Sequence, residues 1–279
     1  RPILRWAGSK RKLLHHLLPY WAEGGEATSK YIEPFMGSAS YFFSISPEEA
    51  ILRDINEDLV NCYRVLRDHP RKLRNIASAI PRNKETYYEI REINLSKEGV
   101  LKRAAYFLYL NRNCFNGLYR TNLSGKFNVP FGAHKSGEMP SLEEFYALSE
   151  VLAKAKIICS DYKNILDESV SEGDFVYLDP PYILPHERVF SAYSASVFDS
   201  RELNILVQKL HEIELKGAKF LLSFAASEHA EEIFSKWNIS EIRVYRSMSS
   251  KVSSRKKTKE FIVSNIDLHL KDLLLDAVV

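Results

Sequence analysis

The sequence has few of the residues that build disulfide frameworks and metal centres. Its 279 residues include three cysteines, Cys62, Cys114 and Cys159, which are widely spaced and odd in number. This spacing predicts neither a disulfide framework nor a metal site, and it indicates a reducing compartment such as the cytoplasm. The eight histidines are scattered, and the adjacent His15 and His16 are best interpreted as a solvated helix face.

Long apolar runs, repeats and low-complexity segments are also missing. No run reaches the length of a membrane span, and no stretch has the pattern of a signal peptide. Hydrophobic residues make up 45% of the chain and charged residues 27%, as in ordinary globular proteins. The net charge of +3 allows a polyanionic partner without being evidence for one. The length suits one large α/β domain with an insertion, or two smaller domains.

The most informative stretch is Asp179-Pro180-Pro181-Tyr182, directly after the apolar run 175–178. The run is short enough for a buried strand, and the two prolines must end it. A carboxylate, a rigid carbonyl and an aromatic ring then stand together at the carboxyl end of a strand, where open α/β sheets bind their ligands.

These three groups suit one kind of ligand. The Asp179 carboxylate and the Pro180 carbonyl are two acceptors for one amino group, and Tyr182 offers a face on which a planar ring can stack. An exocyclic amine on a heteroaromatic base satisfies all three. The alternative is a strand ended by prolines with a surface tyrosine.

A strand, a small-residue turn and a helix are expected over residues 31–40. The strand ends at Glu33, the turn contains Gly37, and the hydroxyls of residues 38 and 40 are available to cap the helix. The next strand, residues 50–56, carries Asp54 where α/β folds commonly bind ribose hydroxyls. The alternative for Asp54 is a cap for the helix that begins near Glu57.

Two further segments complete this region. A glycine-bearing turn separates Trp6 from Lys10, which could bind a carboxylate, before a helix from about residue 11 to 21; the alternative is an ordinary loop. A strand over 156–162 ends in Asp161 and Tyr162, which suit an adenine moiety. Their alternative roles are a helix cap and a core aromatic.

Residues 64–153 differ in character, with dense charge and interleaved aromatics. Helical spacing of apolar residues over 101–108 indicates an amphipathic helix. Ser124-Gly125 between two aromatic-rich runs predicts a hairpin. A two-stranded ribbon that carries Arg and Asn can read bases in a major groove. The alternative is a solvated accessory domain.

The C-terminal third continues the α/β pattern. Helices are expected over 199–216 and 227–237, a strand over 219–224, and an antiparallel pair over 241–246 and 260–265. The loop 183–198 could order on substrate binding. The basic loop 247–259 suits DNA phosphates, or is a plain surface loop.

Together these motifs resemble the Dam-type DNA adenine methyltransferases, the class in which the cofactor motif comes first. The similarity covers nearly the whole chain and involves these segments: residues 5–10, 33–37, 116–120, 127–132, 179–182 and 255–265. Each motif is short, but their shared order makes the resemblance specific.

The resemblance implies a doubly wound, mixed α/β sheet of the S-adenosylmethionine-dependent methyltransferase type. Residues 1–63 and 154–279 would form the catalytic domain, and residues 64–153 an inserted, mainly helical target-recognition domain with a β-hairpin. The enzyme would methylate N6 of a flipped adenine in double-stranded DNA, at a GATC or other GAT-containing site, without a metal. Its setting would be the cytoplasm of a prokaryote or a phage-infected cell, with or without a cognate restriction endonuclease.

The resemblance also assigns residues. Catalytic roles fall to Asp179, Pro180 and Tyr182. Binding of S-adenosylmethionine falls to Trp6, Lys10, Glu33, Phe35, Gly37, Asp54, Asp161 and Tyr162. DNA contacts fall to Arg5, Arg112, Phe115, Asn116, Leu118, Arg120, Asn128, Pro130 and Arg255.

Two departures from the family pattern stand out. Ala39 replaces a frequent second glycine, with little harm expected, and Phe224 replaces a frequent asparagine near the target-base pocket. Two other functions stay open: a methyltransferase acting on RNA or on protein glutamine, and a catalytically silent DNA-binding protein of the same fold. The glutamine enzymes commonly carry Asn at the position of Asp179.

Overall fold

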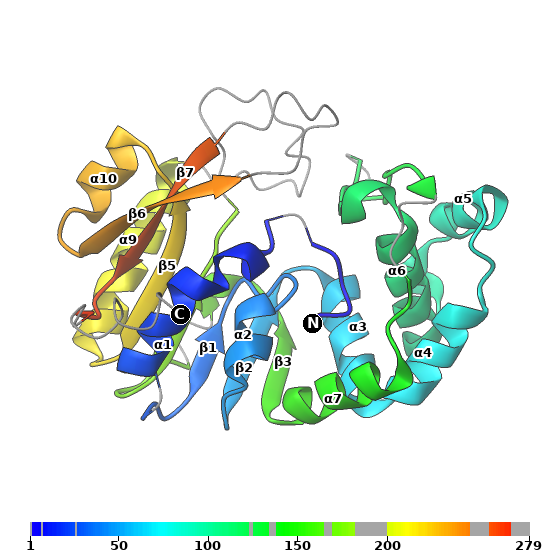
Figure 1. Cartoon of the computed structure of the whole chain (residues 1–279), viewed down its shortest axis with the longest axis horizontal. Helices are drawn as coiled ribbons and strands as arrows, with labels where there is room; N and C mark the ends of the chain where they lie inside the picture. Colours follow the sequence, from blue (N-terminus) through cyan, green and yellow to red (C-terminus); the bar gives the residue numbers. More distant parts are fainter. Residues whose placement is uncertain are drawn as a thin grey trace, which may run out of the picture.

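The computed structural model describes residues 2–6, 8–25, 27–122, 125–133, 138–164, 169–181, 200–245 and 257–268. Its centre is a seven-stranded sheet in the order β3-β2-β1-β4-β5-β7-β6 (Figure 1). The strands are β1 (Tyr31–Glu33), β2 (Ala50–Asp54), β3 (Ala155–Cys159), β4 (Phe175–Leu178), β5 (Lys219–Ala225), β6 (Asn238–Tyr245) and β7 (Lys257–Ser264). The mixed α/β sheet expected from the sequence is confirmed.

The first five strands are parallel, and β7 runs antiparallel to both β5 and β6. In the parallel part, Ile32 of β1 pairs with Ile51 of β2 on one side and Val176 of β4 on the other. The strand order therefore reverses between β1 and β4. In such open sheets the ligand crevice lies outside the carboxyl ends of the strands at that switch point.

Both faces of the central strands are buried, so β1 and β4 are buried along their whole length, whereas β3 and β6 carry exposed polar residues. Tyr31, Phe175 and Tyr177 point into a core shared with η1, α1, α2, α3, α4, α6 and α7. Their neighbours Ile32 and Val176 point into a second core, shared with α9 and α10. Two layers of helix thus hold the strands in place and fix where each strand ends.

The described helices have the following bounds: η1 (Lys10–Leu13), α1 (Leu14–Gly24), α2 (Ser40–Ile45), α3 (Glu57–Asp68), α4 (Pro70–Ala79), α5 (Lys84–Glu92), η2 (Leu95–Lys97), α6 (Val100–Asn113), η3 (Phe115–Gly117), α7 (Leu142–Ala153), α9 (Ser200–Leu215) and α10 (Glu228–Phe234). Among the helices in these ranges, none has the length and apolar content needed to span a bilayer.

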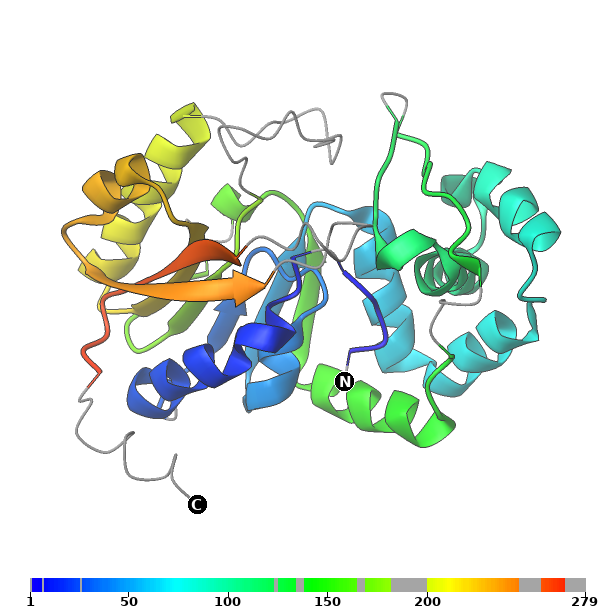
Figure 2. The ribbon, with the colours of Figure 1, turned by 45° about the horizontal axis from the view of Figure 1, so that its top comes forward.

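The helices α3 to α7 all lie between β2 and β3 in sequence, and α4, α5 and α6 extend beyond the β3 edge of the sheet (Figures 1 and 2). The predicted domain boundary at residues 63 and 64 falls inside α3, which continues through it. Because α3, α4, α6 and α7 share the core of the sheet, only α5, the end of α6 and the hairpin form a separate apolar cluster. The division into two domains stays a prediction.

The predicted hairpin is present in reduced form. Thr121 and Phe127 form an antiparallel bridge, as do Cys114 and Phe131, and no named strand lies in the described part of this segment. The amide of Lys126 is held by the Asn122 side chain at 2.9 Å. The ribbon is therefore closed by single bridges and a turn rather than by a continuous ladder.

Several predicted element boundaries shift. The strand predicted over 156–162 ends at Cys159, two residues before Asp161. The basic loop predicted over 247–259 is shorter, because Lys257–Ser264 forms β7 and Lys259 pairs with Glu241 at 2.8 Å. Phe224 is buried and packs on Phe234, with ring centroids 5.4 Å apart. The Phe224 ring thus belongs to the core beneath α10.

Candidate active site at the carboxyl ends of the strands

Three acidic side chains gather where neighbouring strands end. Glu33 is the last residue of β1, Asp54 the last of β2, and Asp179 directly follows β4. Because β2, β1 and β4 are adjacent and parallel, these carboxylates share one edge of the sheet at the topological switch point. The sequence predicted each acid separately, and the sheet order brings them together.

Glu33 is the most deeply buried of the three. Its side chain is 3% exposed and accepts a hydrogen bond of 2.8 Å from the Tyr31 hydroxyl. Burial raises the pKa of Glu33 well above its usual value, and the nearby charges of Asp179 and Asp54 raise it further. A cationic ligand beside these carboxyl groups would favour their ionised forms and oppose this rise.

Asp54 is held through both carboxylate oxygens. Its Oδ2 accepts from the Gly37 amide at 3.1 Å and its Oδ1 from the Asn56 amide at 2.9 Å. Burial raises its pKa to about 6, although these backbone hydrogen bonds act in the opposite direction. The helix-cap alternative for Asp54 is wrong, because the Asn56 side chain caps α3 by accepting from Leu59 N at 3.0 Å.

The turn after β1 has an unusual backbone. Gly37 and Ala39 both adopt positive φ, at 44° and 50°. Ala39 is fully buried and precedes the first residue of α2. An alanine in this region is less favourable than a glycine by about 1 kcal/mol, so the expectation of little harm from Ala39 omitted a backbone cost.

The expected capping of this helix by serine hydroxyls is wrong. No side chain caps α2. Instead the hydroxyls of Ser9, Ser38 and Ser40 bond one another, with oxygen separations of 2.7 to 3.0 Å. These bonds fasten the N-terminal segment to the turn that carries Gly37.

Lys10 lies among the acids rather than in an open loop. It is 6% exposed, and its Nζ is 2.8 Å from Asp179 Oδ1 and 3.5 Å from Glu260 Oε2. The sequence predicted that Lys10 binds a carboxylate of the ligand, whereas in the structure its partners are the protein carboxylates Asp179 and Glu260. Glu260, which is buried on β7, was not singled out, although it lies within the 255–265 segment of the resemblance.

An aromatic pair lies beside Asp161, the acid that was predicted to end the strand over 156–162. The rings of Phe35 and Tyr162 are 4.9 Å apart, and the Tyr162 hydroxyl donates to Glu202 at 3.0 Å. Burial and the Glu202 carboxylate raise the pKa of Tyr162. Asp161 Oδ1 accepts from the Lys163 amide at 2.9 Å. Both Asp161 and Tyr162 therefore already have partners in the protein.

Ile55, next to Asp54, is a residue that sequence reasoning missed. It is 61% exposed, beside the half-buried Asp54. An isolated isoleucine after a strand carries no clear sequence signal. Exposed at the carboxyl end of β2, it offers an apolar surface to a ligand.

Pro180 is buried and Pro181 is exposed at the start of the loop that follows β4. Tyr182 and Arg255 lie outside the described residues. Within the described ranges, no group of three or more histidine, cysteine or acidic side chains is arranged to hold a metal ion.

The predicted base-reading residues lie on the hairpin. Arg120 donates through Nε to Asn128 Oδ1 at 2.7 Å, so two predicted readers bond each other. Pro130 is exposed, Phe115 is 41% exposed, and Asn116 adopts a positive φ of 54°. Leu118 packs partly against the cluster of α5 and α6.

Arg5 and Arg112 lie at the junction between the N-terminal segment and α6, where their hydrogen bonds join the two. Arg112 Nη1 donates to the Ile3 carbonyl at 3.0 Å, and its Nη2 donates to the Glu138 carbonyl. Burial, followed by the charges of Arg5 and Arg82, lowers the pKa of Arg112 to about 10. The Arg5 backbone exchanges two hydrogen bonds with the Asn111 side chain, of 2.8 and 2.6 Å.

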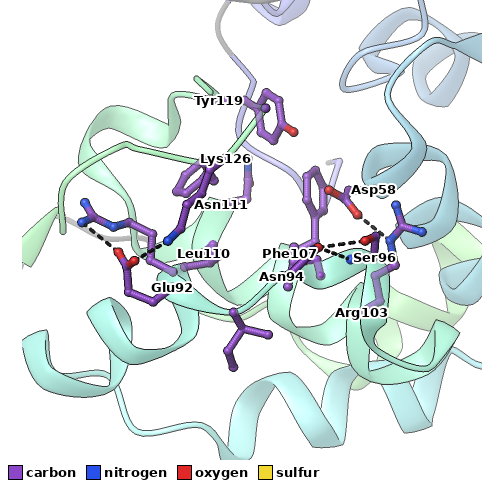
Figure 3. Close-up of a pocket in the computed structure, with 15 residues that line it drawn as sticks. Asp58, Glu92, Asn94, Ser96, Arg103, Phe107, Leu110, Asn111, Tyr119 and Lys126 are labelled. Carbon is purple, nitrogen blue, oxygen red and sulfur yellow. Dashed lines mark hydrogen bonds and ion pairs between the residues drawn. The ribbon is translucent and has the colours of Figure 1, made fainter. Parts of the chain in front are cut away.

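A pocket of about 540 Å³ lies away from the strand ends, between α5, η2, α6 and the hairpin (Figure 3). Asp58 and Arg103 form an ion pair of 2.5 Å on one side, and Glu92 and Lys126 pair on the other. Its charges are thus matched within the protein, and none of the three strand-end acids lines it.

Residues 6–248 match the family model for the D12 class N6 adenine-specific DNA methyltransferases. The chain is 35% identical to the type II methyltransferase M1.LlaDCHI of Lactococcus lactis subsp. cremoris, over 95% of each chain. It is 32% identical to the type II methyltransferase M.MjaIII of Methanocaldococcus jannaschii, over 92% of this chain and 95% of that one. It is 31% identical to the DNA adenine methylase of Escherichia coli K12, over 94% of each. With this match over most of its length, and with a mixed α/β sheet whose acids meet at the switch point, the chain belongs to the D12 class of N6 adenine-specific DNA methyltransferases.

Proposed function

We propose that this protein moves a methyl group from S-adenosylmethionine to N6 of an adenine that has left the DNA stack, at a GAT-containing site. The observation that carries the proposal is the position of Asp179 and Pro180 at the end of β4, beside the acids that end β1 and β2. A target amine at Asp179 would then lie next to a donor bound by Glu33 and Asp54.

The residues at the strand ends fit this donor. Glu33 and Asp54 supply carboxyl groups that a cationic donor would hold ionised, and acceptors for ribose hydroxyls. The exposed Ile55 and the ring pair of Phe35 and Tyr162 supply apolar surface for an adenine ring. S-adenosylmethionine supplies an activated methyl group on a sulfonium sulfur, so the protein's task is mainly alignment and removal of water.

The position of Lys10 changes its proposed role. Because its ammonium lies 2.8 Å from Asp179, Lys10 would hold that carboxylate ionised and in place, in addition to any contact with the donor. Glu260, at 3.5 Å on the other side, would help to keep Lys10 positioned. Lys10 and Glu260 would therefore act through Asp179 as positioning residues.

Asp179 and Pro180 would each accept one hydrogen bond from the target amine. Drawing both N–H groups toward acceptors turns the nitrogen lone pair out of the ring system, which makes the nitrogen a better nucleophile. As the nitrogen gains its methyl group it loses one proton, for which Asp179 is the adjacent acceptor. Tyr182 would stack on the flipped ring, which partly offsets the few kcal/mol that flipping costs.

The hairpin would read the target sequence. Arg120 can form two hydrogen bonds to a guanine edge, and Asn128 would be released from Arg120 when it does so. Leu118, Phe115 and Pro130 would contact thymine methyl groups or wedge into a base step. Asn116 and Arg255 complete the proposed DNA contacts, while Arg5 and Arg112 would act mainly through the base of the hairpin.

The type II names of two relatives support a further part of the proposal. A restriction endonuclease of the same sequence specificity would accompany this enzyme, in the cytoplasm of a prokaryote. Extracts of the source cells should then cut unmethylated DNA but spare DNA that this protein has methylated.

The direct test is incubation with radiolabelled S-adenosylmethionine and a matched set of duplexes. One duplex contains GATC, a second contains the same site with its adenines already methylated at N6, and a third has the same base composition without GAT. Label on the first duplex alone is expected. Label on the third would keep the enzyme and reject the sequence preference.

Absence of transfer has a separate meaning. If the protein binds the donor and the GATC duplex but labels neither DNA, RNA nor protein, it is a silent DNA-binding member of the family. Label on RNA or on glutamine side chains of protein would instead reject the DNA substrate.

A further inference from the structure

Tyr119 on the hairpin reaches back to the strand-end site. It directly precedes Arg120, yet its ring stacks on Trp6 with centroids 5.3 Å apart and an interplanar angle of 19°. Phe107 of α6 and Phe127 of the hairpin lie on its other sides, at 5.8 and 5.6 Å. Tyr119 is thus the ring that joins the hairpin to the N-terminal segment.

Trp6 in turn lies against the turn that follows β1. A Cβ atom added to Gly37 would be 3.0 Å from Trp6 Cδ1, so the indole and this backbone are in close contact. The Gly37 amide donates to Asp54 Oδ2 at 3.1 Å. One contact path therefore runs from Tyr119 through Trp6 and Gly37 to one oxygen of Asp54.

A second path leads to the other oxygen of the same carboxylate. The Asn56 side chain lies close enough to the Tyr119 hydroxyl to lower its pKa, and Asp58 of α3 lies nearby. Burial and the charge of Asp58 raise the pKa of Tyr119 to about 12, so the hydroxyl stays protonated at neutral pH. The Asn56 amide donates to Asp54 Oδ1 at 2.9 Å. Tyr119 is therefore linked to both segments whose amides hold Asp54, to Gly37 through Trp6 and to Asn56 by proximity.

The hairpin borders open space beside Tyr119. Tyr119, Phe127 and Lys126 line the pocket of about 540 Å³ that lies between the hairpin, α5 and α6 (Figure 3). Arg120 must leave Asn128 to reach a base, and its neighbour Tyr119 shares its backbone. A rearrangement of Arg120 would therefore shift Tyr119 relative to Trp6 and Asn56.

We propose that Tyr119 couples DNA reading to donor binding: a cognate duplex on the hairpin tightens the donor site at Asp54 through Trp6 and Asn56, and the bound donor tightens DNA binding equally. The inference rests on the proposed function, because it takes Asp54 as a donor residue and the hairpin as the DNA reader. Thermodynamic linkage requires the two effects to be of the same size.

The test measures binding without turnover. S-adenosylhomocysteine, the demethylated donor, is titrated into the protein by calorimetry with and without a saturating GATC duplex, and the duplex is titrated with and without S-adenosylhomocysteine. In the unmodified protein each ligand should tighten the other by about tenfold, within the usual range of coupling between sites. Agreement of the two factors checks the linkage.

Three variants separate coupling from a structural role. Tyr119→Leu keeps apolar bulk against Phe107 and Phe127 but removes the flat ring and hydroxyl, and it should reduce the coupling to less than about twofold. Tyr119→Phe keeps the stack on Trp6 and should retain most of the coupling. Tyr146→Leu, an exposed tyrosine on α7, is the matched control and should couple like the unmodified protein.

The outcomes are distinct. Full coupling in Tyr119→Leu, or its loss in Tyr146→Leu, would overturn the role of Tyr119. Two ligands that bind the unmodified protein independently would overturn the coupling and leave the proposed function intact. A protein that binds neither ligand would overturn the proposed function itself.

Discussion

The strand-end site and the hairpin hold their polar groups in different ways. At the strand ends, Asp54 is fixed by two backbone amides and Glu33 by the Tyr31 hydroxyl; Glu33 is buried and Asp54 is half-buried. On the hairpin, Arg120 and Asn128 are only partly buried and bond each other. The first arrangement is built from the core of the fold, and the second from side chains that can change partners.

This difference has energetic consequences. A buried charge that loses its partner is left with a large desolvation penalty, whereas exposed pairs contribute only about 0–1 kcal/mol and exchange partners readily. Rigid strand ends suit chemistry that needs fixed alignment. Exchangeable hairpin contacts suit a surface that must release its own bonds before it reads a base. Substitutions in the two regions should therefore change different measured quantities.

The largest effect is expected at Asp179. Asp179→Ala should reduce methyl transfer to GATC duplexes by roughly a thousandfold or more, because the target amine loses an acceptor needed only as the transition state forms. The protein should still fold, since Glu260 remains within 3.5 Å of Lys10. Single-turnover kinetics and the thermal unfolding midpoint check both statements. Near-normal transfer would remove Asp179 from the catalytic group.

Arg120 should control sequence choice. Arg120→Ala should lower the preference for GAT over other sequences by on the order of ten- to a hundredfold, as expected for the loss of a two-bond contact to guanine. The exposed Lys72 of α4 provides the control, and Lys72→Ala should leave that preference unchanged. The measurement is kcat/KM on a panel of single-base variants. A ratio unaffected by Arg120→Ala would exclude it as a base reader.

The pH dependence of donor affinity should distinguish the role of Asp54 from the role of the hairpin. Its pKa of about 6 lies above the ordinary value of 3.8, so the carboxylate is ionised above pH 6 and protonated below it. Donor affinity should therefore fall about tenfold between pH 7 and pH 5, since roughly a tenth of the group stays ionised at pH 5. Asp54→Asn should bind the donor weakly and without this dependence. An equal pH dependence in Asp54→Asn would assign the effect to another group.

The raised pKa of Asp54 changes the stability of the fold in the opposite direction: stability falls as the pH rises, whereas donor affinity increases. The folded protein binds the Asp54 proton more tightly than the unfolded chain does. The contribution of this group to the free energy of unfolding should therefore decrease as the pH rises from about 4 to about 6.

The smallest effect is expected at Ala39. Ala39→Gly should raise the free energy of unfolding by less than about 1 kcal/mol, because a glycine adopts the positive φ without strain but loses a buried methyl group. Ser46→Gly, at a φ of 47° at the end of α2, is a matched substitution away from the donor turn. Calorimetric unfolding compares the two. A lower stability of Ala39→Gly alone would show that packing of the methyl group outweighs the backbone strain.

Local sequence signals were reliable where one residue type has one physical consequence. The prolines after Leu178 end β4 as expected. Gly217, which has a φ of 75°, follows the last turn of α9. The apolar spacing over 101–108 gives the buried face of α6. The serines near α2 gave a wrong prediction of a helix cap, because a hydroxyl can bond a neighbouring hydroxyl as well as a helix end. Here Ser9 bonds the hydroxyls of both Ser38 and Ser40.

By itself, the sequence determined where the strands of the sheet lie, the acids at the strand ends and the family to which these motifs belong, because each depends on residues that are adjacent in the chain. Only the tertiary structure decided that Lys10 pairs with Asp179 and Glu260, that Arg120 bonds Asn128, and that Tyr119 stacks on Trp6. Lys10 is separated from Asp179 and from Glu260 by more than half of the chain. Such partners are chosen by the sheet order and by the packing of the helices against it, which no local pattern contains.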